Sequence, residues 1–310
     1  MLVTVENRTA GCDWAARPWP WCRGVAESMR TNQHPERRQD AGCGPSASAS
    51  NGGLRIGVLI VAYNAATTLV DVLRRIPAEV WANVEAVAVF DDASTDNTVA
   101  VVQTYRATRQ DDRLRIVQNP HNLGYGGNQK RGYQHFIAQG FDIVVLLHGD
   151  GQYAPELLPD LYAPIVAGQA DAVLGSRITS RYGGPLQGGM PLYKYVGNRL
   201  LTAIANASLK MHLSEFHCGY RAYRLEALRH LTLATMTDDF HFDTQIIVKL
   251  HHQQFRIREV PIPTYYGDEV CHVNGVQYAW NVIQTLLRYR RTVSAARSAP
   301  EYAEFHPARP

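Results

Sequence analysis

The stretch Arg55-Ile-Gly-Val-Leu-Ile-Val61 decides how the rest of the chain is interpreted. This short apolar run is rich in β-branched residues, which favours a buried strand. Residues 67–76 follow with apolar side chains at helical spacing, so they predict a helix with one buried face. A buried strand that leads directly into a helix is typical of the opening unit of an α/β fold.

The same alternation of strand and helix continues along the chain. Strands are predicted over residues 84–90, 114–118, 142–147 and 172–175, and helices over residues 98–108, 126–139 and 157–167. Elements in this order predict a doubly wound α/β fold, with a mostly parallel sheet and helices on both faces. Ligands bind such sheets at the carboxyl ends of the strands, so functional residues are expected directly after Val61, Phe90 and Leu147.

Polar residues do follow these three strands. Tyr63 and Asn64 come after the first, Asp91 and Asp92 after the second, and His148-Gly-Asp-Gly-Gln152 after the third. Preferences for turns and helix caps explain many polar residues in such places, but not three carboxylates at one sheet edge. Because like charges repel, a cation or a donor-rich ligand is expected among these acids.

Composition limits the domain organisation and the partners. The chain has 310 residues, of which 45% are hydrophobic, and a formal net charge of +3. It is long enough for a full core and too weakly basic to suggest a nucleic-acid-binding protein. We predict a disordered leader over residues 1–52, a folded domain over 53–268, and a C-terminal amphipathic helix and tail over 269–310.

Cysteine use and hydropathy bear on the compartment. The five cysteines are odd in number and scattered, which favours a reducing, cytoplasmic setting without a disulfide framework. No run of about 18 apolar residues is present in the sequence, so no membrane-crossing helix is expected. The pairs His217-Cys218 and Cys271-His272 do not indicate a zinc site, because neighbours in an extended chain point to opposite faces.

Seven motifs together resemble those of the family 2 GT-A glycosyltransferases, in particular the dolichol-phosphate mannose synthase-like branch. In order, they are Ile60-Val-Ala-Tyr-Asn64, Phe90-Asp-Asp-Ala-Ser-Thr-Asp96, Asn119-Pro-His-Asn-Leu-Gly-Tyr-Gly-Gly-Asn128, Leu147-His-Gly-Asp-Gly-Gln-Tyr-Ala-Pro-Glu156, Gly175-Ser-Arg177, His217-Cys-Gly-Tyr-Arg-Ala-Tyr223 and Glu259-Val-Pro-Ile262. The resemblance covers residues 54–266 and implies a GT-A domain over 53–268. It also implies an inverting transfer of sugar from a UDP- or GDP-sugar, with Mg²⁺ or Mn²⁺ as cofactor.

The resemblance implies which residues contact the nucleotide sugar. Asp91 and Asp92 would recognise the base and the ribose, in keeping with the acceptor-only character of carboxylates. Tyr63 would pack against the base or ribose beside Asn64. A half-buried tyrosine at a strand end is an equally good interpretation of Tyr63.

A glycine-rich segment over residues 122–130 is implied to line the same pocket. Its expected contacts with the nucleotide sugar are Gly124, Asn128 and Lys130. Taken alone, the segment is also consistent with a tight turn at the start of a helix. Either Lys130 or Arg131 is expected to belong to a solvated helix face instead.

His148-Gly149-Asp150 stands where the family has its Asp-x-Asp metal motif. Asp150 is therefore the expected metal ligand and catalytic residue, holding the cation against the diphosphate, which Gln152 contacts. His148 replaces the first acid of the motif. An imidazole suits Mn²⁺ better than Mg²⁺, so His148 is either a second ligand or a hydrogen-bond partner of the sugar or of a nearby acid.

Basic residues are expected on the acceptor side. Arg177 and Lys194 fall where the resemblance places the ligands of an acceptor phosphate, and guanidinium groups bind phosphate well. Arg199 and Arg221 either assist them or form structural ion pairs with acids such as Glu215. The implied acceptor is a polyprenyl phosphate or a related lipid-linked molecule.

Alternatives remain for the acceptor and for the activity. A hydroxyl acceptor needs a general base, for which Asp243 is the expected residue and Asp238 and Asp239 are the alternatives. A non-catalytic nucleotide-sugar-binding protein is a further alternative. A nucleotidyltransferase would need a basic, glycine-rich loop after the first strand, where this chain has Ala62-Tyr-Asn-Ala-Ala-Thr67.

The helix expected over residues 276–291 ends in Arg288-Tyr-Arg-Arg291. It either lies on an anionic membrane surface or packs on the domain, with a basic end that suits its dipole. The first alternative predicts a protein that is peripheral to the inner face of the membrane.

Overall fold

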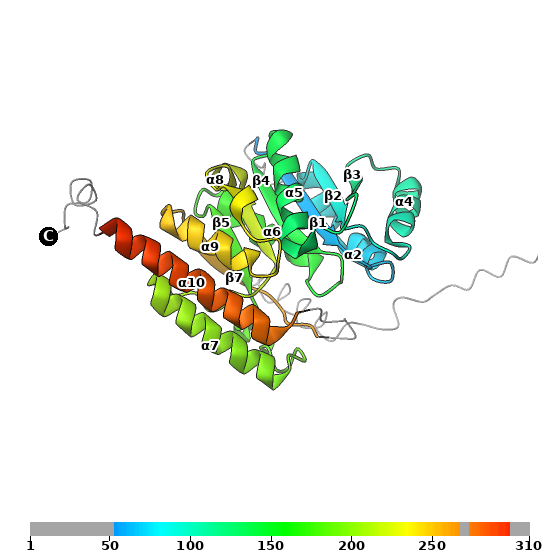
Figure 1. Cartoon of the computed structure of the whole chain (residues 1–310). Helices are drawn as coiled ribbons and strands as arrows, with labels where there is room; N and C mark the ends of the chain where they lie inside the picture. Colours follow the sequence, from blue (N-terminus) through cyan, green and yellow to red (C-terminus); the bar gives the residue numbers. More distant parts are fainter. Residues whose placement is uncertain (1–52, 267–272, 298–310) are drawn as a thin grey trace, which may run out of the picture. The chain divides into compact units, whose positions relative to one another are not determined.

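The architecture is seen in a computed structural model that describes residues 53–266 and 273–297. Its centre is a seven-stranded sheet with the strand order β3-β2-β1-β4-β6-β5-β7 (Figure 1). The strands are β1 (Ile56–Ala62), β2 (Ala86–Asp91), β3 (Leu114–Gln118), β4 (Ile143–His148), β5 (Ala172–Ser176), β6 (Arg221–Arg224) and β7 (Ile257–Pro261). The expected leader over residues 1–52, the pair Cys271-His272 and the tail beyond residue 297 lie outside the described residues.

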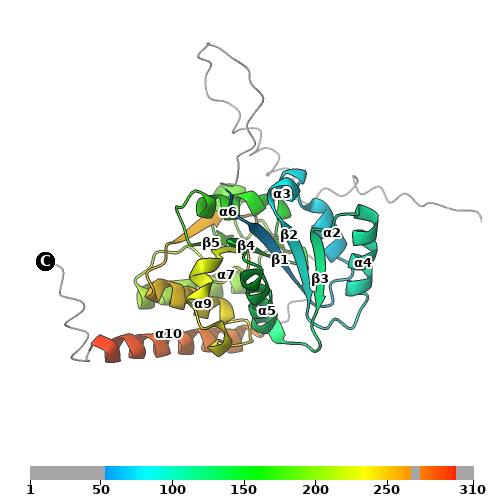
Figure 2. The ribbon, with the colours of Figure 1, turned by 90° about the horizontal axis from the view of Figure 1, so that it is seen from above.

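Helices cover both faces of the sheet. They are α2 (Leu69–Arg75), α3 (Ala78–Asn83), α4 (Thr98–Arg109), α5 (Gly124–Ala138), α6 (Leu158–Val166), α7 (Leu192–Leu209), α8 (Leu225–Arg229), α9 (Phe242–His252) and α10 (Gly275–Arg297). Figure 2 shows α3 and α6 on one side of the sheet and α5 and α9 on the other. Tyr133 and Phe136 of α5 join Leu59 of β1 and Ile246 of α9 in one core. The predicted doubly wound, mostly parallel α/β fold is confirmed.

Strand β6 was not predicted, and it runs antiparallel to both of its neighbours, β4 and β5. Its sequence, Arg221-Ala-Tyr-Arg224, carries two arginines and does not resemble a buried strand. The strand pairs with both neighbours, and the charge of the fully buried Arg221 is compensated on α9, where Asp243 lies 3.6 Å from its guanidinium group. That partner is distant in the sequence, so the local pattern does not reveal it.

Helices α7 and α10 lie side by side and share a second core with α9 (Figure 1). Leu201 and Ala205 of α7 meet Val282 and Leu286 of α10 in this core, together with Ile247 of α9. Over the described parts of the chain, no helix combines the length and the apolar character needed to cross a bilayer.

The ends of β1, β2 and β4 form the edge that carries the polar motifs. Their register pairs Ala62 with Asp91 and Val61 with His148. The order of the strands reverses at β1, which has β2 on one side and β4 on the other. Ligands of doubly wound sheets bind in the crevice at such a switch point. The fold therefore brings the three predicted motifs to the place where a ligand is expected.

Candidate functional site

The loops that follow β1 and β2 are joined by the side chain of Asn64. Its carboxamide oxygen accepts a hydrogen bond from the backbone N–H of Thr95 at 2.9 Å, and the backbone N–H of Asn64 donates to Ser94 Oγ at 2.9 Å. Asn64 has a φ of 50°, a conformation that asparagine tolerates better than most residues. Asn64 thus stabilises the edge, and Tyr63 beside it remains 44% exposed.

Asp91 is fully buried at the end of β2. Its carboxylate accepts hydrogen bonds from the hydroxyl of Ser94 and, at 3.0 Å, from the backbone N–H of Ser94. The turn between them holds Ala93 at a φ of 57°, which is unfavourable for a residue with a Cβ. Asp91 therefore stabilises this turn, and its predicted contact with a nucleotide stays a prediction.

Asp92 is buried and holds the N-terminus of α5. Its carboxylate accepts hydrogen bonds from the backbone N–H groups of Leu123 at 2.8 Å and Gly124 at 3.0 Å, and from Asn119 Nδ2 at 2.7 Å. A negative charge is favourable at a helix N-terminus because the N–H groups there lack partners within the helix. These amides are thus already paired, although sequence analysis had placed a ligand in this segment.

The glycines of the same segment allow another part of the chain to cross it closely. A Cβ on Gly124 or Gly126 would lie within 2.8 Å of a backbone oxygen of Asp238 or Thr237. The Gly126 N–H donates to the Asp238 carbonyl at 2.7 Å. Lys130 Nζ donates to a carbonyl of the same crossing segment, residues 236–238, and pairs with the Asp238 carboxylate. Packing therefore accounts for these glycines and for the position of Lys130.

Asn128 is a buried link between α5 and the sheet. Its Nδ2 donates to the Phe90 carbonyl at 2.9 Å, and its Oδ1 accepts from Asn119 Nδ2 at 3.0 Å. Sequence analysis did not single out Asn119, although it stands in a quoted motif directly after β3. For Asn128, as for Gly124 and Lys130, a contact with the nucleotide stays a prediction.

Asp150 is exposed at this edge, after β4. One carboxylate oxygen accepts a hydrogen bond from the backbone N–H of Gln152 at 3.0 Å, and Gly151 between them has a φ of 79°. Among the described residues, no three His, Cys, Asp or Glu side chains are grouped to hold a metal ion. The site nevertheless fits Mg²⁺ or Mn²⁺, because such ions are commonly bound by one or two carboxylates together with substrate phosphates.

His148 packs between two tyrosine rings. The centroid of its ring lies 5.7 Å from that of Tyr125 and 5.0 Å from that of Tyr153, and both contacts are edge to face. Its Nε2 is buried without a hydrogen-bond partner in this structure. Burial lowers the pKa of His148 and favours the neutral imidazole. Its predicted part in metal binding stays a prediction.

Asp243 lies in the first turn of α9 and is only 5% exposed. The Tyr125 hydroxyl donates to its Oδ2 at 2.8 Å, and Arg221 lies 3.6 Å from the same oxygen. Its Oδ1 is buried and has no hydrogen-bond partner. Sequence analysis missed Tyr125, which precedes Asp243 by 118 residues, and no local pattern could have joined the two.

Arg177 follows β5 and forms a buried ion pair with Glu215. Its backbone N–H donates to Glu215 Oε2 at 2.7 Å and its Nε to Oε1 at 3.0 Å. The guanidinium group also donates to the His217 carbonyl at 3.2 Å and to the Tyr266 hydroxyl at 3.3 Å. Burial alone would raise the pKa of Glu215, but the charge of Arg177 holds this pKa below its usual value.

The other three predicted acceptor ligands differ in exposure. Arg221 is fully buried and donates to carbonyl groups of Cys218, Phe216 and Asp243, so it stabilises the fold as an ion-pair partner rather than facing solvent. Lys194 Nζ lies 5.0 Å from the centroid of the Tyr266 ring. Arg199 is exposed on α7.

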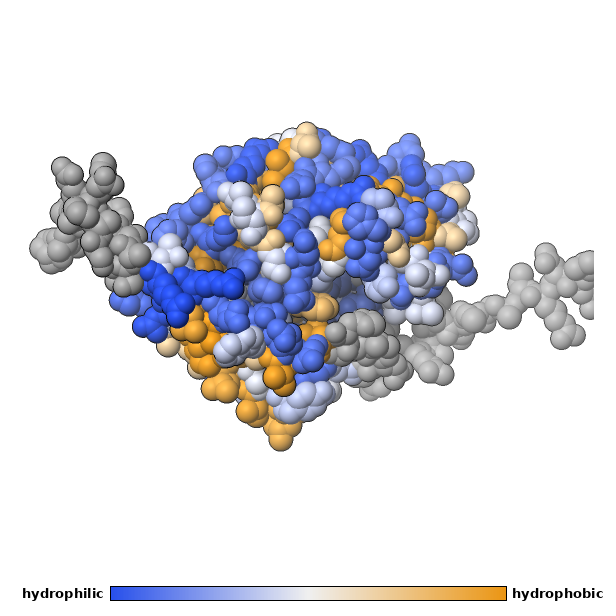
Figure 3. Space-filling view, in the orientation of Figure 1, coloured by the Kyte–Doolittle hydropathy of each residue, from blue (hydrophilic) through white to orange (hydrophobic). Residues whose placement is uncertain are grey.

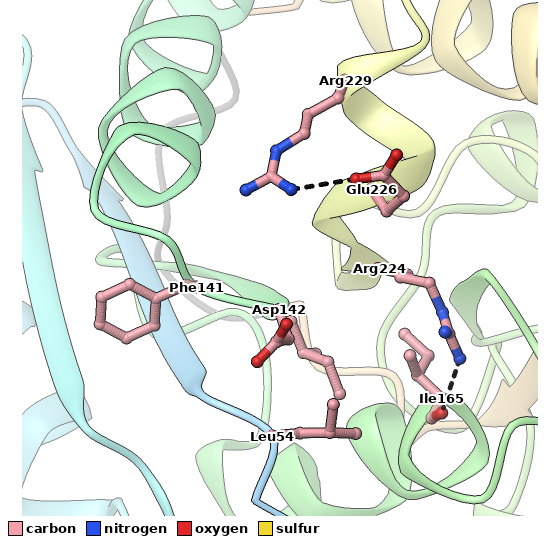
Figure 4. A pocket seen from close by; sticks show the side chains of 8 residues that line it. Leu54, Phe141, Asp142, Ile165, Arg224, Glu226 and Arg229 are labelled. Atoms are coloured by element: carbon pink, nitrogen blue, oxygen red, sulfur yellow. Dashed lines mark hydrogen bonds and ion pairs between the residues drawn. The ribbon is translucent and has the colours of Figure 1, made fainter.

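Two hollows lie away from this edge. One of about 250 Å³ is at the opposite ends of β1 and β4, where Figure 4 shows Asp142, Arg224 and the Arg229–Glu226 ion pair around it. The other, of about 530 Å³, lies beside α4. Neither contains a residue of the motifs at the switch point, so we place the candidate site by its strand ends and not by cavity size.

Comparison with known proteins identifies the family. The model described as "Glycosyl transferase family 2" matches residues 57–232. Glycosyltransferase AglD of Haloferax volcanii is 27% identical over 225 residues, which are 70% of this chain but only 34% of that longer protein. The UDP-N-acetylglucosamine–dolichyl-phosphate N-acetylglucosaminyltransferase of Methanococcus voltae is 26% identical over 75% of this chain and 94% of its own length.

The fold has a counterpart among solved structures. Glucosyl-3-phosphoglycerate synthase from Mycobacterium tuberculosis, solved with Mn²⁺, UDP and phosphoglyceric acid, matches with a TM-score of 0.60. The match covers 78% of this chain and 81% of that one at 19% identity, so it supports the GT-A fold and nothing about substrates. Because the family model matches more than half of the sequence, the chain belongs to glycosyl transferase family 2 and is a glycosyltransferase.

Proposed function

We propose that this enzyme moves a sugar from a UDP- or GDP-sugar to a polyprenyl phosphate. The observation that carries the proposal is the contrast between two acids. Asp150 is exposed at the switch point, whereas Asp243, the expected base for a hydroxyl acceptor, is buried and engaged by Tyr125 and Arg221. A phosphate acceptor is already anionic and needs no base. The name of the Methanococcus voltae relative, which specifies dolichyl phosphate, supports the same acceptor class.

The donor edge, as we call the ends of β1, β2 and β4, would hold the nucleotide sugar. Tyr63 offers an exposed ring to the base or ribose, and Gln152 lies beside the diphosphate position expected at Asp150. Asp150 would hold Mg²⁺ or Mn²⁺ against the diphosphate, and the bound cation would neutralise charge on the departing nucleotide. Glucosyl-3-phosphoglycerate synthase, which has a similar fold, was solved with Mn²⁺ and UDP, and this supports a divalent cofactor.

The acceptor side, as we call Arg177, Lys194 and the buried pairs behind them, would orient the acceptor phosphate. A phosphate oxygen would form a bond to the anomeric carbon while the bond from that carbon to the diphosphate breaks. Attack from the face opposite the leaving group inverts the anomeric configuration. Arg177 is fixed by Glu215, so it would present a preorganised cation with little loss of side-chain entropy.

We also propose that α7 and α10 dock on an anionic membrane at the cytoplasmic face. Their outer sides expose Tyr193 (73%), Val276 (83%) and Trp280 (56%), and Figure 3 shows hydrophobic residues gathered over this part of the surface. Arg288, Arg290 and Arg291 are exposed on the last part of α10. Apolar side chains beside cations match the apolar interior and the negative surface of such a membrane.

The catalytic proposal is tested by supplying radiolabelled UDP- and GDP-sugars, Mn²⁺ and vesicles that contain a polyprenyl phosphate. We expect label to enter the lipid fraction as a glycosyl phosphate with inverted anomeric configuration. Binding of a nucleotide sugar without any transfer to lipid or water-soluble acceptors would support the non-catalytic alternative and contradict the proposal.

The membrane proposal is tested by flotation with vesicles rich in phosphatidylserine, at low and high salt. The double variant Tyr193→Ser/Trp280→Ser should bind on the order of tenfold less than wild type, because two apolar contacts are lost. Tyr105→Ser on α4 is the control and should float like wild type. Equal flotation of all three proteins would contradict docking through α7 and α10.

A further inference from the structure

Helix α10 is packed into the domain along one side. Val282 and Leu286 are buried in the core that α10 shares with α7 and α9. Tyr278 lies one turn before Val282 on the same stripe of the helix, and so points toward the body of the protein. The outer side of the same helix carries Val276 and Trp280, which are exposed. One face of α10 is therefore buried in the domain and the opposite face is exposed. The buried face carries Tyr278, which contacts a residue near Arg177.

Tyr278 contacts His217, which lies just before β6. The Tyr278 hydroxyl and His217 Nδ1 are 2.8 Å apart, and the two rings meet edge to face with their centroids 5.5 Å apart. Burial lowers the pKa of His217 to about 4, so its imidazole is neutral near pH 7. Burial likewise raises the pKa of Tyr278, which therefore keeps its proton. The contact is a hydrogen bond between two neutral groups.

His217 is joined in turn to Arg177. The carbonyl of His217 accepts a hydrogen bond from the Arg177 guanidinium group at 3.2 Å. Glu215, two residues earlier, binds both the backbone and the side chain of Arg177. Residues 215–217 thus form one face of the cradle that fixes Arg177. Anything that holds His217 in place also limits the positions that this guanidinium group can adopt.

A second contact joins α10 to the loop before α9, which crosses the glycine-rich segment. Asn281 Nδ2 donates to Asp239 Oδ2 at 3.3 Å. The preceding residue, Asp238, accepts the hydrogen bond from Gly126 in the glycine-rich segment. α10 is therefore connected to both sides of the site through short paths of packed and hydrogen-bonded groups.

We propose that Tyr278 is a positioning residue for the acceptor phosphate, acting through His217 on Arg177. This inference rests on the proposed function, because it takes Arg177 as a ligand of that phosphate. It gives the inner side of α10 a role on the acceptor side, in addition to the membrane contact proposed for the outer side of the helix. Loss of the tyrosine hydroxyl would release residues 215–217 and weaken binding of the acceptor, while the donor edge stays as it is.

The test compares Tyr278→Phe with Tyr289→Phe, a matched control on the same helix. Tyr289 also meets a histidine edge to face, but this histidine is His252 of α9, and Tyr289 lies about three helical turns after Tyr278. Tyr278→Phe should raise the KM for polyprenyl phosphate three- to tenfold, the effect expected from one lost hydrogen bond. The KM for the nucleotide sugar should stay within twofold, and Tyr289→Phe should leave both values unchanged.

Two substitutions of His217 sharpen the test. Asparagine can place its amide where Nδ1 lies, so His217→Asn should keep most of the acceptor affinity. Glutamine reaches toward the Nε2 position instead, so His217→Gln should resemble Tyr278→Phe. A purely structural role would lower the melting temperature of all of these variants without a selective change in the KM for the acceptor.

Calorimetry with farnesyl phosphate separates this inference from the proposed function. If wild type binds farnesyl phosphate, Tyr278→Phe binds it at least threefold more weakly and no transfer occurs, the inference stands and the proposed function fails. If wild type transfers sugar to polyprenyl phosphate and Tyr278→Phe matches Tyr289→Phe in every value, the inference is overturned. Absence of farnesyl phosphate binding by wild type would overturn it as well.

Discussion

At the ends of β1, β2 and β4, buried carboxylates are held by neutral donors, whereas around β5 and β6 they are paired with buried guanidinium groups. Asp92 illustrates the first arrangement, with two backbone N–H groups and an amide around it. The pairs Arg177–Glu215 and Arg221–Asp243 illustrate the second. The donor edge thus depends on loop geometry, while the acceptor side depends on charge balance. Substitutions in the two regions should therefore fail in different ways.

The largest effect is expected for Asp150→Asn. Asp150 is exposed at the switch point and is the predicted metal ligand, so its loss should lower kcat/KM on the order of a hundredfold or more, as for other groups that stabilise developing charge. The melting temperature should hardly change. Asp112→Asn, an exposed acid after α4, is the control and should keep wild-type kinetics. Near-wild-type turnover of Asp150→Asn with Mn²⁺ present would refute the assigned metal site.

The largest loss of stability is expected for Glu215→Gln. Removing one partner of a buried ion pair leaves an uncompensated charge and typically costs about 3–5 kcal/mol. The control is Glu85→Gln, which breaks an exposed pair with Arg55 and should cost less than about 1 kcal/mol. Urea unfolding of both variants gives the two free energies. Equal losses would mean that the acceptor side does not depend on charge balance.

Acid should destabilise the acceptor side through His217. Its pKa is about 4 in the folded state, below the ordinary value of 6.5, so between these values the unfolded state binds more protons. The contribution of His217 to the free energy of unfolding should therefore be constant above pH 6.5. It should fall as the pH drops from 6.5 to 4, by at most about 3 kcal/mol. His217→Asn should show a shallower fall in urea unfolding. An identical pH dependence in both proteins would contradict the buried, neutral His217.

A smaller loss of stability is expected for Asp92→Ala. Three donors around the carboxylate would lose their partner, which should lower the free energy of unfolding by about 1–3 kcal/mol. Affinity for UDP and GDP should fall only slightly, because the substitution affects the nucleotide site indirectly, by loosening the start of α5. Calorimetry and urea unfolding decide the matter together. A large loss of nucleotide affinity without loss of stability would instead support the predicted direct contact between Asp92 and the nucleotide.

The contrast between the donor edge and the acceptor side also explains what the sequence could and could not predict. The alternation of strands and helices and the polar motifs after Val61, Phe90 and Leu147 are local patterns, and the structure confirms that the three motifs meet at one edge. Local patterns do not reveal partners. The segment over residues 122–130 was interpreted as lining a ligand pocket, and no local pattern shows that Gly126 within it also packs against the backbone of Thr237, about 110 residues further on.

On the acceptor side, the sequence identified the basic residues but did not show which groups surround them. Arg177 and Arg199 are both arginines, and the sequence does not tell their surroundings apart. In the structure, Arg177 is fixed by Glu215, whereas Arg199 is exposed on α7. Arg221 illustrates the limit most clearly, because its burial depends on Asp243, which is brought near only by the packing of α9 against the sheet. Tyr125 and Tyr278 were missed for the same reason.

The most direct test of the account is the choice between a phosphate and a hydroxyl acceptor. Vesicles carrying equal amounts of a polyprenyl phosphate and the corresponding polyprenol would be incubated with wild type, Mn²⁺ and the donor that it uses, and the labelled lipids separated by charge. Because Asp243 is buried and engaged, the account predicts label on the phosphate and at most traces on the alcohol. Equal or preferential glycosylation of the polyprenol would contradict it and make Asp243 the candidate general base.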